Sequence, residues 1–324
     1  MIQLKIKLSI ILKPIKPFDF DNSVYNPTHY DTPEAETEAY EKGKFWQTMR
    51  FKDKLLGFKF ENKGTVDKPK VKLTIYSKNK LDKKLVNEIV DELNYRFEFN
   101  KDLSEFCNKF KNDKFLGSVL KKRKGMRNKC GYSLYESLMI YITLQNATVR
   151  RTVQMMTNLL KKYGTPVEFD KKKLYVFWNS EKLAKTSEDE LRALKVGYRD
   201  KMFIRISEAF ANKEINELKL RNMPKEDILK EMIKLYGVGK QSASYMLFEV
   251  FHDHETLDHM PPWEGKILSK IMFGKFVSED KLLKEFEKRY DKWKRLAFVY
   301  IFADIFWRRE YGEKIDWLEK EIRL

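Results

Sequence analysis

The sequence predicts an α+β fold with two parts: a small antiparallel sheet-plus-helix domain at residues 1–100 and an all-helical body at residues 101–324. Two observations carry this prediction. Apolar and polar residues alternate in several short runs of the first hundred residues, whereas apolar residues recur at helical spacing in almost every later segment. No repeat or low-complexity linker separates the two regions. We therefore expect the domains to pack directly on each other.

The amino-terminal region contains three stretches of strand-like alternation, at Ile2–Leu8, Trp46–Phe60 and Val71–Ile75. The spacing then changes to helical over Leu81–Phe99, where Leu85, Ile89, Val90 and Leu93 share one face. The segment Pro14–Pro33 is rich in Pro, Asp and Asn and is expected to be irregular. An antiparallel sheet backed by one helix is the simplest arrangement of these elements.

The later segments have the apolar spacing and the end signals of helices. Ser187 and Glu190 fit a capping box, and Gly164 fits a helix stop. The predicted helices are Leu103–Leu120, Tyr132–Leu144, Thr148–Tyr163, Ser187–Leu194, Lys201–Ala211, Lys225–Leu235, Lys240–Phe251, Gly265–Phe273 and Lys281–Arg308.

Composition narrows the class of partner. There are 65 Lys and Arg against 48 Asp and Glu, and the resulting net charge of +17 favours a polyanion, with nucleic acid as the leading candidate. No segment is apolar over the roughly 18 residues that a membrane span needs. Met1–Leu12 mixes Lys with Ile and Leu and does not resemble a signal peptide. We expect an intracellular protein, in the cytoplasm or nucleoid, with no membrane partner.

The most informative stretch is Leu235-Tyr236-Gly237-Val238-Gly239-Lys240. Two glycines separated by one apolar residue permit a tight hairpin with positive φ, and they let another backbone approach closely. A helix over Lys240–Phe251 would direct its first N–H groups out of that hairpin, where a phosphate is a suitable ligand. The alternative is a helical corner whose glycines serve packing alone.

Asp258 follows Gly239 by nineteen residues. A helix over Lys240–Phe251 advances about 18 Å, and the seven residues 252–258 span up to about 23 Å when extended. The chain can therefore return and place the Asp258 carboxylate near the hairpin. The alternative is that Asp258 caps a turn before Pro261-Pro262.

Several motifs occur in a shared order. They are Leu138–Arg151, Val196–Lys201 with its Gly-Tyr-Arg sequence, Leu235–Gly239 and Thr256–Asp258, with fainter matches at Pro17–Asp21 and Asp102–Phe106. This order, over most of the chain, resembles the helix-hairpin-helix DNA glycosylases, which remove damaged bases.

The resemblance assigns roles to particular residues. It implies that Asp258 is the catalytic carboxylate, which stabilises an oxocarbenium-like transition state and orients a water. It implies DNA contacts from Arg199 and from the hairpin residues Gly237, Val238, Gly239, Lys240 and Gln241. Asn146, with Gln145 beside it, is the candidate wedge that fills the gap left by a flipped base. The alternative is that both residues only cap the helix junction.

A flipped base needs aromatic surfaces. Trp293 resembles an aromatic residue of the alkylpurine branch of this family, and Tyr300 and Trp263 are further candidates for the base pocket. The alternative for each is a core aromatic.

Gln241 departs from the pattern of family members that also cut the strand, which have a lysine at this place. This difference favours a monofunctional glycosylase, although Lys240 is adjacent. Gln241 and the carboxy-terminal aromatic helix lean slightly toward alkylated purines, such as 3-methyladenine, as substrates. The alternatives are a bifunctional 8-oxoguanine glycosylase and AP lyase, and a noncatalytic helix-hairpin-helix protein that binds DNA.

Cofactor expectations follow from the same residues. Two cysteines, Cys107 and Cys130, cannot supply the four thiolates of an iron–sulfur cluster. The resemblance implies a structural monovalent cation at the hairpin carbonyls. His252, Asp253, His254 and His259 have close spacing, but no further ligand pattern supports a metal. We expect a monomer that acts on double-stranded DNA with a damaged base, with the lysine runs 121–124 and 171–173 as candidate phosphate contacts.

Overall fold

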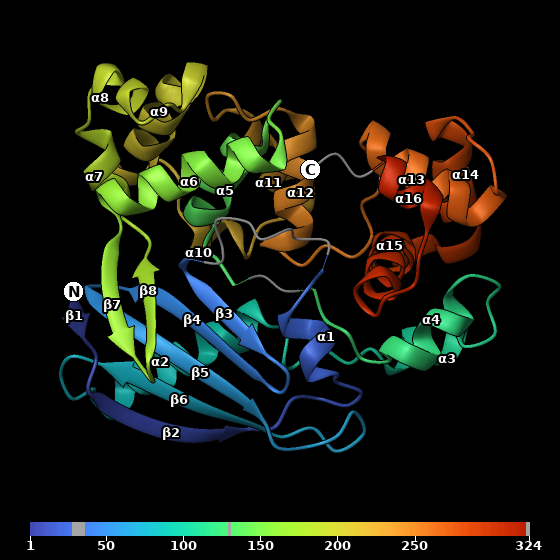
Figure 1. Cartoon of the computed structure of the whole chain (residues 1–324), viewed down its shortest axis with the longest axis horizontal. Coiled ribbons are helices and arrows are strands. Elements are labelled where there is room, and N and C mark those ends of the chain that lie inside the picture. The colour runs from blue at the N-terminus through green and yellow to red at the C-terminus, as the bar shows by residue number, and fades with distance from the viewer. Residues whose placement is uncertain (28–35, 129–130, 322–324) are drawn as a thin grey trace.

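A computed structural model describes residues 1–27, 36–128 and 131–321 of the chain (Figure 1). A sheet lies at the bottom of the view, one group of helices lies above it, and a second group of helices lies to the right. The α+β fold class predicted from the sequence is confirmed. None of the described helices has both the length and the apolar content that crossing a bilayer requires.

The described part of the amino-terminal region contains a five-stranded antiparallel sheet with the order β2-β6-β5-β4-β3. Its strands are β2 (Ile6–Leu12), β3 (Glu38–Glu41), β4 (Lys44–Phe51), β5 (Lys54–Asn62) and β6 (Val71–Ser77). Helix α2 (Lys83–Arg96) covers one face, and the core between them includes Phe45, Phe58 and Ile89, each less than 1 % exposed. Within the predicted irregular segment, Asp19 caps the short helix α1 (Phe20–Val24).

A second sheet corrects the all-helical prediction for residues 101–324. Strands β7 (Thr165–Phe169) and β8 (Lys172–Val176) form a hairpin, and β1 (Ile2–Gln3) adds to β7 in parallel. The turn residues Asp170 and Lys171 have φ of +46° and +63°, which is the left-handed region that two-residue hairpin turns require. The hairpin therefore joins the helical body to the amino-terminal sheet.

The first group of helices packs around one apolar core, which includes Leu159, Phe203 and Met246. Its elements are α5 (Leu134–Leu144), α6 (Val149–Tyr163), α7 (Ser180–Ala184), α8 (Glu188–Ala193), η2 (Gly197–Arg199), α9 (Asp200–Ala211), α10 (Glu217–Leu220), α11 (Lys225–Ile233) and α12 (Lys240–Glu249).

The second group has its own core, which includes Leu268, Phe286 and Ile301. Its elements are α3 (Ser104–Phe110), α4 (Leu116–Arg123), α13 (Pro262–Phe273), α14 (Glu279–Tyr290), η3 (Asp291–Trp293), α15 (Lys294–Glu310) and α16 (Asp316–Glu321). Two long predicted helices are wrong as single helices. The first is interrupted between α3 and α4, and the second breaks at Asp291, whose φ is +46°.

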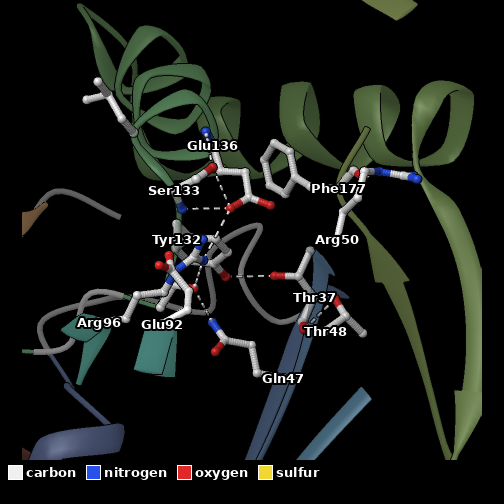
Figure 2. Close-up of polar contacts among 12 residues, drawn as sticks. Thr37, Gln47, Thr48, Arg50, Glu92, Arg96, Tyr132, Ser133, Glu136 and Phe177 are labelled. Atoms are coloured by element: carbon white, nitrogen blue, oxygen red, sulfur yellow. Dashed lines mark hydrogen bonds and ion pairs between the residues drawn. The ribbon is translucent and has the colours of Figure 1, made fainter. Parts of the chain in front are cut away.

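Buried polar contacts fix helix α5 against the amino-terminal domain (Figure 2). Arg96, at the end of α2, donates to the Gly131 carbonyl at 2.9 Å and lies 3.7 Å from the Glu136 carboxylate. Gln47 of β4 donates to the same carbonyl at 3.1 Å. Glu136 and Ser133 form the capping box of α5. The start of α5 is therefore held in a fixed position relative to the sheet.

Candidate active site and nucleic-acid interface

The predicted hairpin lies between α11 and α12. Gly237 has φ +80°, and a Cβ there would come within 2.8 Å of the Met202 side chain. Val238 is buried and donates its N–H to the Leu235 carbonyl at 3.0 Å. Gly239 has an ordinary φ of −86° and open space around its Cα. The local sequence thus produces a tight turn with one buried anchor and two exposed glycines.

The turn delivers the amino-terminal end of α12 to the surface. Gly239 is the N-cap residue, and within the described chain no side chain caps the first turn of this helix. Lys240 and Gln241, the first two helical residues, are exposed. The first N–H groups of α12 therefore lack intrahelical partners and carry partial positive charge, which suits an anionic ligand.

The predicted wedge lies beside this hairpin. Gln145 ends α5 and donates its side-chain N–H to the Gly237 carbonyl at 3.1 Å. Asn146 is exposed, with φ +47°, and donates to the hydroxyl of exposed Tyr198 at 3.4 Å. Gln145 therefore connects the two turns, whereas Asn146 projects from the surface next to them.

Arg199 does not occupy the position expected of a DNA contact. It is 5 % exposed, and its guanidinium donates to the carbonyls of Ile142, at 2.9 Å, Val196, at 3.3 Å, and Gln145. The bonds to Ile142 and Gln145 satisfy carbonyl groups in the last turn of α5 and just after it. Arg199 therefore positions the turn that carries Asn146.

Asp258 is exposed on the return segment between α12 and α13. The segment is anchored on both sides of it. The His254 carbonyl accepts hydrogen bonds from the backbone N–H groups of Arg295 and Leu296, at 3.2 and 3.4 Å, at the start of α15. The Met260 N–H donates to the Glu279 carboxylate at 2.7 Å. An exposed carboxylate on a fixed segment is thus available to an external ligand.

The three predicted pocket aromatics occupy different positions. Tyr300 is completely buried and donates to the Met126 carbonyl at 2.6 Å, which corrects the prediction and makes it a core residue. Trp293 is 8 % exposed, and its ring centroid lies 5.5 Å from that of Phe106 in the second core. Trp263, in the first turn of α13, is 38 % exposed and is the accessible aromatic of the three.

A buried polar group near the return segment escaped sequence reasoning. We call Tyr245 of α12, Glu264 of α13 and Arg295 of α15 the Glu264 cluster. The Tyr245 hydroxyl donates to Glu264 at 2.8 Å, and the Arg295 guanidinium lies 5.0 Å from the Tyr245 ring centroid. Burial raises the pKa of Glu264 to about 7, and the charge of Arg295 and the Tyr245 hydrogen bond only partly oppose this shift.

Some of the remaining charged candidates have local structural partners. Lys172 pairs with Glu41 at 2.8 Å, and Arg123 is buried against Asp304 at 3.1 Å. Among the described residues no group of three or more His, Cys, Asp or Glu side chains is arranged to hold a metal ion. Cys107 is buried with a free thiol, and Cys130 lies outside the described residues.

The described arrangement is a helix-hairpin-helix motif: a glycine hairpin exposes a helix end beside the turn at Gln145 and Asn146, and the return segment after that helix carries an exposed carboxylate. DNA-3-methyladenine glycosylase of Bacillus subtilis (strain 168) is 27% identical over 161 residues, which are 49% of this chain and 53% of that protein. The chain thus matches about half the length of this curated relative. No family model matches the sequence.

Two solved structures are similar over nearly the whole chain. The 3-methyladenine DNA glycosylase of Archaeoglobus fulgidus has a TM-score of 0.73 and 15% identity, covering 94% of this chain and 100% of that one. The 8-oxoguanine glycosylase/lyase of Clostridium acetobutylicum, bound to double-stranded DNA with cytosine opposite 8-oxoguanine, has a TM-score of 0.66 and 19% identity, covering 94% and 96%. The chain has the fold of the helix-hairpin-helix DNA glycosylase superfamily, as the resemblance of its motifs predicted.

Proposed function

We propose that this protein is a monofunctional DNA glycosylase that removes a damaged purine from double-stranded DNA. The observation that carries the proposal is the exposed amino-terminal end of α12 together with the exposed Asp258 on an anchored return segment. The names of the similar proteins support the activity class, and they divide between 3-methyladenine and 8-oxoguanine.

Binding begins at the hairpin. The N–H groups at the start of α12 take a phosphate of the DNA backbone, and the exposed Lys240 adds positive charge. Asn146 fills the space that the flipped nucleotide leaves in the duplex. The proposal includes a structural monovalent cation that the hairpin carbonyls bind. The carbonyls of Leu235 and Gly237 each accept one hydrogen bond and retain a second lone pair for it.

Hydrolysis then needs one carboxylate. As the N-glycosidic bond breaks, the base leaves with the bonding electron pair and takes up a proton. The ionised Asp258 stabilises positive charge on the sugar and orients the water whose oxygen bonds to the anomeric carbon. The products are a free base and an abasic site. The site of action is wherever the cell holds its DNA, in the cytoplasm or nucleoid.

Gln241 supports hydrolysis without strand cleavage. A glutamine amide cannot form the Schiff base by which an amine nucleophile cuts the strand. Lys240 is the exposed amine next to it and keeps the bifunctional alternative open to test.

The decisive experiment incubates the protein with end-labelled duplexes that each carry one lesion: an alkylated purine, 8-oxoguanine, hypoxanthine or uracil. Products are resolved with and without alkali. Strand breaks that appear only after alkali are expected, and the lesion that yields them identifies the substrate. Breaks without alkali would contradict a monofunctional enzyme, and tight binding without any breaks would favour a noncatalytic DNA-binding protein.

A further inference from the structure

The Glu264 cluster has hydrogen-bonding capacity that the described residues leave unused. Glu264 is 8 % exposed and Arg295 is 4 % exposed. One carboxyl oxygen of Glu264 and the Nε of Arg295 are buried without a partner among the described residues. Leaving a buried polar group unpaired is unfavourable, and more so for a charged one. These two groups are therefore candidates for ligand contacts.

Aromatic rings surround the Arg295 guanidinium. It lies 5.0, 4.7 and 4.9 Å from the ring centroids of Tyr245, Phe248 and Phe298. In the described part of the chain Arg295 forms no ion pair, although its charge acts on Glu264 and lowers the pKa of that carboxyl. Aromatic faces attract a cation, but they do not accept hydrogen bonds from its five N–H groups as a carbonyl oxygen does. The guanidinium can therefore bind a hydrogen-bond acceptor that is uncharged or anionic.

The three elements of the cluster converge on the segment that carries Asp258. Tyr245 lies five residues into α12, about 8 Å along the helix from the hairpin. Glu264 follows Asp258 by six residues, in the first turn of α13. The backbone N–H of Arg295 binds the carbonyl of His254, four residues before Asp258. A ligand held at Asp258 by its sugar can therefore direct its base toward the cluster.

The cluster also reaches the surface through aromatic rings. Tyr245 and Tyr141 are half-buried, and their ring centroids are 5.4 Å apart with an angle of 42° between the rings. Stacking surfaces, the unpaired carboxyl oxygen of Glu264 and the unpaired Nε–H donor of Arg295 suit a flat heterocycle with both a donor and a carbonyl on its edge.

We propose that Glu264 and Arg295 are the specificity-determining residues that bind the flipped base, selecting a neutral oxopurine and disfavouring purines made cationic by N-alkylation. The inference rests on the proposed glycosylase function and names its substrate class. It departs from the slight lean of the sequence toward alkylated purines.

The charge balance supports this selection. Arg295 brings a fixed positive charge into a region of low dielectric, where a cationic base is repelled most strongly. Because the pKa of Glu264 is raised to about 7, a substantial share of this carboxyl is neutral at neutral pH, and its negative charge offsets the repulsion only in part. In the neutral form the carboxyl can donate one hydrogen bond and accept another, as a neutral base edge requires.

The test compares 8-oxoguanine with 7-methylguanine, because both are guanine lesions and only the second is cationic in the nucleotide. Single-turnover excision is measured for the natural sequence and for three variants, Glu264→Leu, Glu264→Gln and Arg295→Gln. We expect the natural protein to prefer 8-oxoguanine, and Arg295→Gln to reduce that preference at least tenfold. Glu264→Leu should slow 8-oxoguanine excision at least tenfold, whereas Glu264→Gln, which keeps a donor and an acceptor, should retain most of the rate.

Arg123→Gln is the matched control. Arg123 is another buried arginine, and its guanidinium lies 5.0 Å from the Trp307 ring centroid, but it does not contact the return segment. Its variant should leave the ratio of the two rates unchanged. Thermal unfolding of every variant shows which of them fold.

The outcomes separate the two proposals. A preference of the natural protein for 7-methylguanine, or a preference that survives Arg295→Gln, overturns this inference and leaves the glycosylase proposal intact. Absence of excision on any lesion overturns the proposed function. In that case binding is measured alone, with duplexes in which a 2′-fluorinated sugar at the lesion prevents cleavage. Equal affinity for the two guanine lesions would then overturn the inference as well.

Discussion

Nε2 of His254 lies 2.9 Å from a carboxylate oxygen of Glu98, although the two residues are 156 positions apart in the chain. Both side chains are buried. Glu98 lies just after α2 in the amino-terminal domain, whereas His254 lies on the return segment that carries Asp258. The pair therefore fixes the candidate catalytic segment to the small domain through a contact that neither part of the sequence reveals.

This pair gives the stability of the protein a defined pH dependence. Burial alone would raise the pKa of Glu98, but the charge and hydrogen bond of His254 lower it to about 2. The folded state therefore favours the ionised form. Its contribution, at most about 3 kcal/mol, is complete above pH 4.5 and is lost as the pH falls from 4.5 toward 2. We expect Glu98→Gln to lower Tm at pH 7 and to flatten the fall of Tm between pH 5 and pH 3.

His252 adds to the same trend at higher pH. Burial lowers its pKa below 6.5 although Glu98 opposes the shift, so protonation favours unfolding as the pH falls through 6.5. The control for the Glu98 variant is Glu88→Gln, which removes a surface pair with Lys52. That pair should contribute about 1 kcal/mol or less. Equal pH profiles of Tm for the two variants would contradict a role for the buried pair.

Asp258→Asn should abolish most of the excision activity while DNA binding is retained. The substitution keeps the size of the side chain and removes the charge that stabilises the transition state, so we expect a loss of at least about 10²-fold in the single-turnover rate. Excision by rapid quench and duplex affinity by fluorescence anisotropy are measured on the same preparation. An equal loss in both quantities would mean that Asp258 acts in binding.

Gly237→Ala should weaken DNA binding and lower stability, because Gly237 has positive φ and its Cβ would press on Met202. A cost of about 1 kcal/mol or more is expected from the backbone conformation alone. Gly239→Ala is the control for folding, since φ is −86° there and nothing lies within 4 Å. Thermal unfolding and anisotropy are again the measurements. Tm values that fall equally in both variants would refute the assigned hairpin geometry.

Borohydride trapping should yield no covalent adduct between the protein and lesion-containing DNA. Gln241 cannot act as an amine nucleophile, and we expect Lys240 to contact phosphate. Lys240→Ala should therefore weaken binding in a salt-dependent manner and leave the rate of the bound complex nearly unchanged. An adduct that forms with the natural protein and disappears in Lys240→Ala would establish the bifunctional alternative.

Local chain properties explain what the sequence could predict. The hairpin depends on two glycines and the helix after them, so it follows from residues within one short segment. The β7–β8 hairpin was missed because five-residue strands with charged turns carry little periodicity, and its partner β1 lies at the other end of the chain.

Long-range packing explains what the sequence could not predict. The motif predicts that Arg199 contacts DNA, but the carbonyl groups around the end of α5 take its donors. Tyr300 looks like a pocket aromatic in sequence, yet the arrangement of α15 against residue 126 buries it. The Glu264 cluster combines residues from three helices whose juxtaposition only the folded chain creates.

The hydrogen bond from Gln145 to the Gly237 carbonyl joins the candidate wedge turn to the hairpin. In the proposed complex, contact with the DNA backbone at the hairpin and with the base stack at the wedge would bend the duplex. Stiff, well-stacked steps resist such bending, whereas damaged or mispaired steps yield to it at lower cost. Under the proposed function, the protein would find damage by testing how easily the duplex bends, and the reaction at Asp258 would begin only where the duplex has already bent.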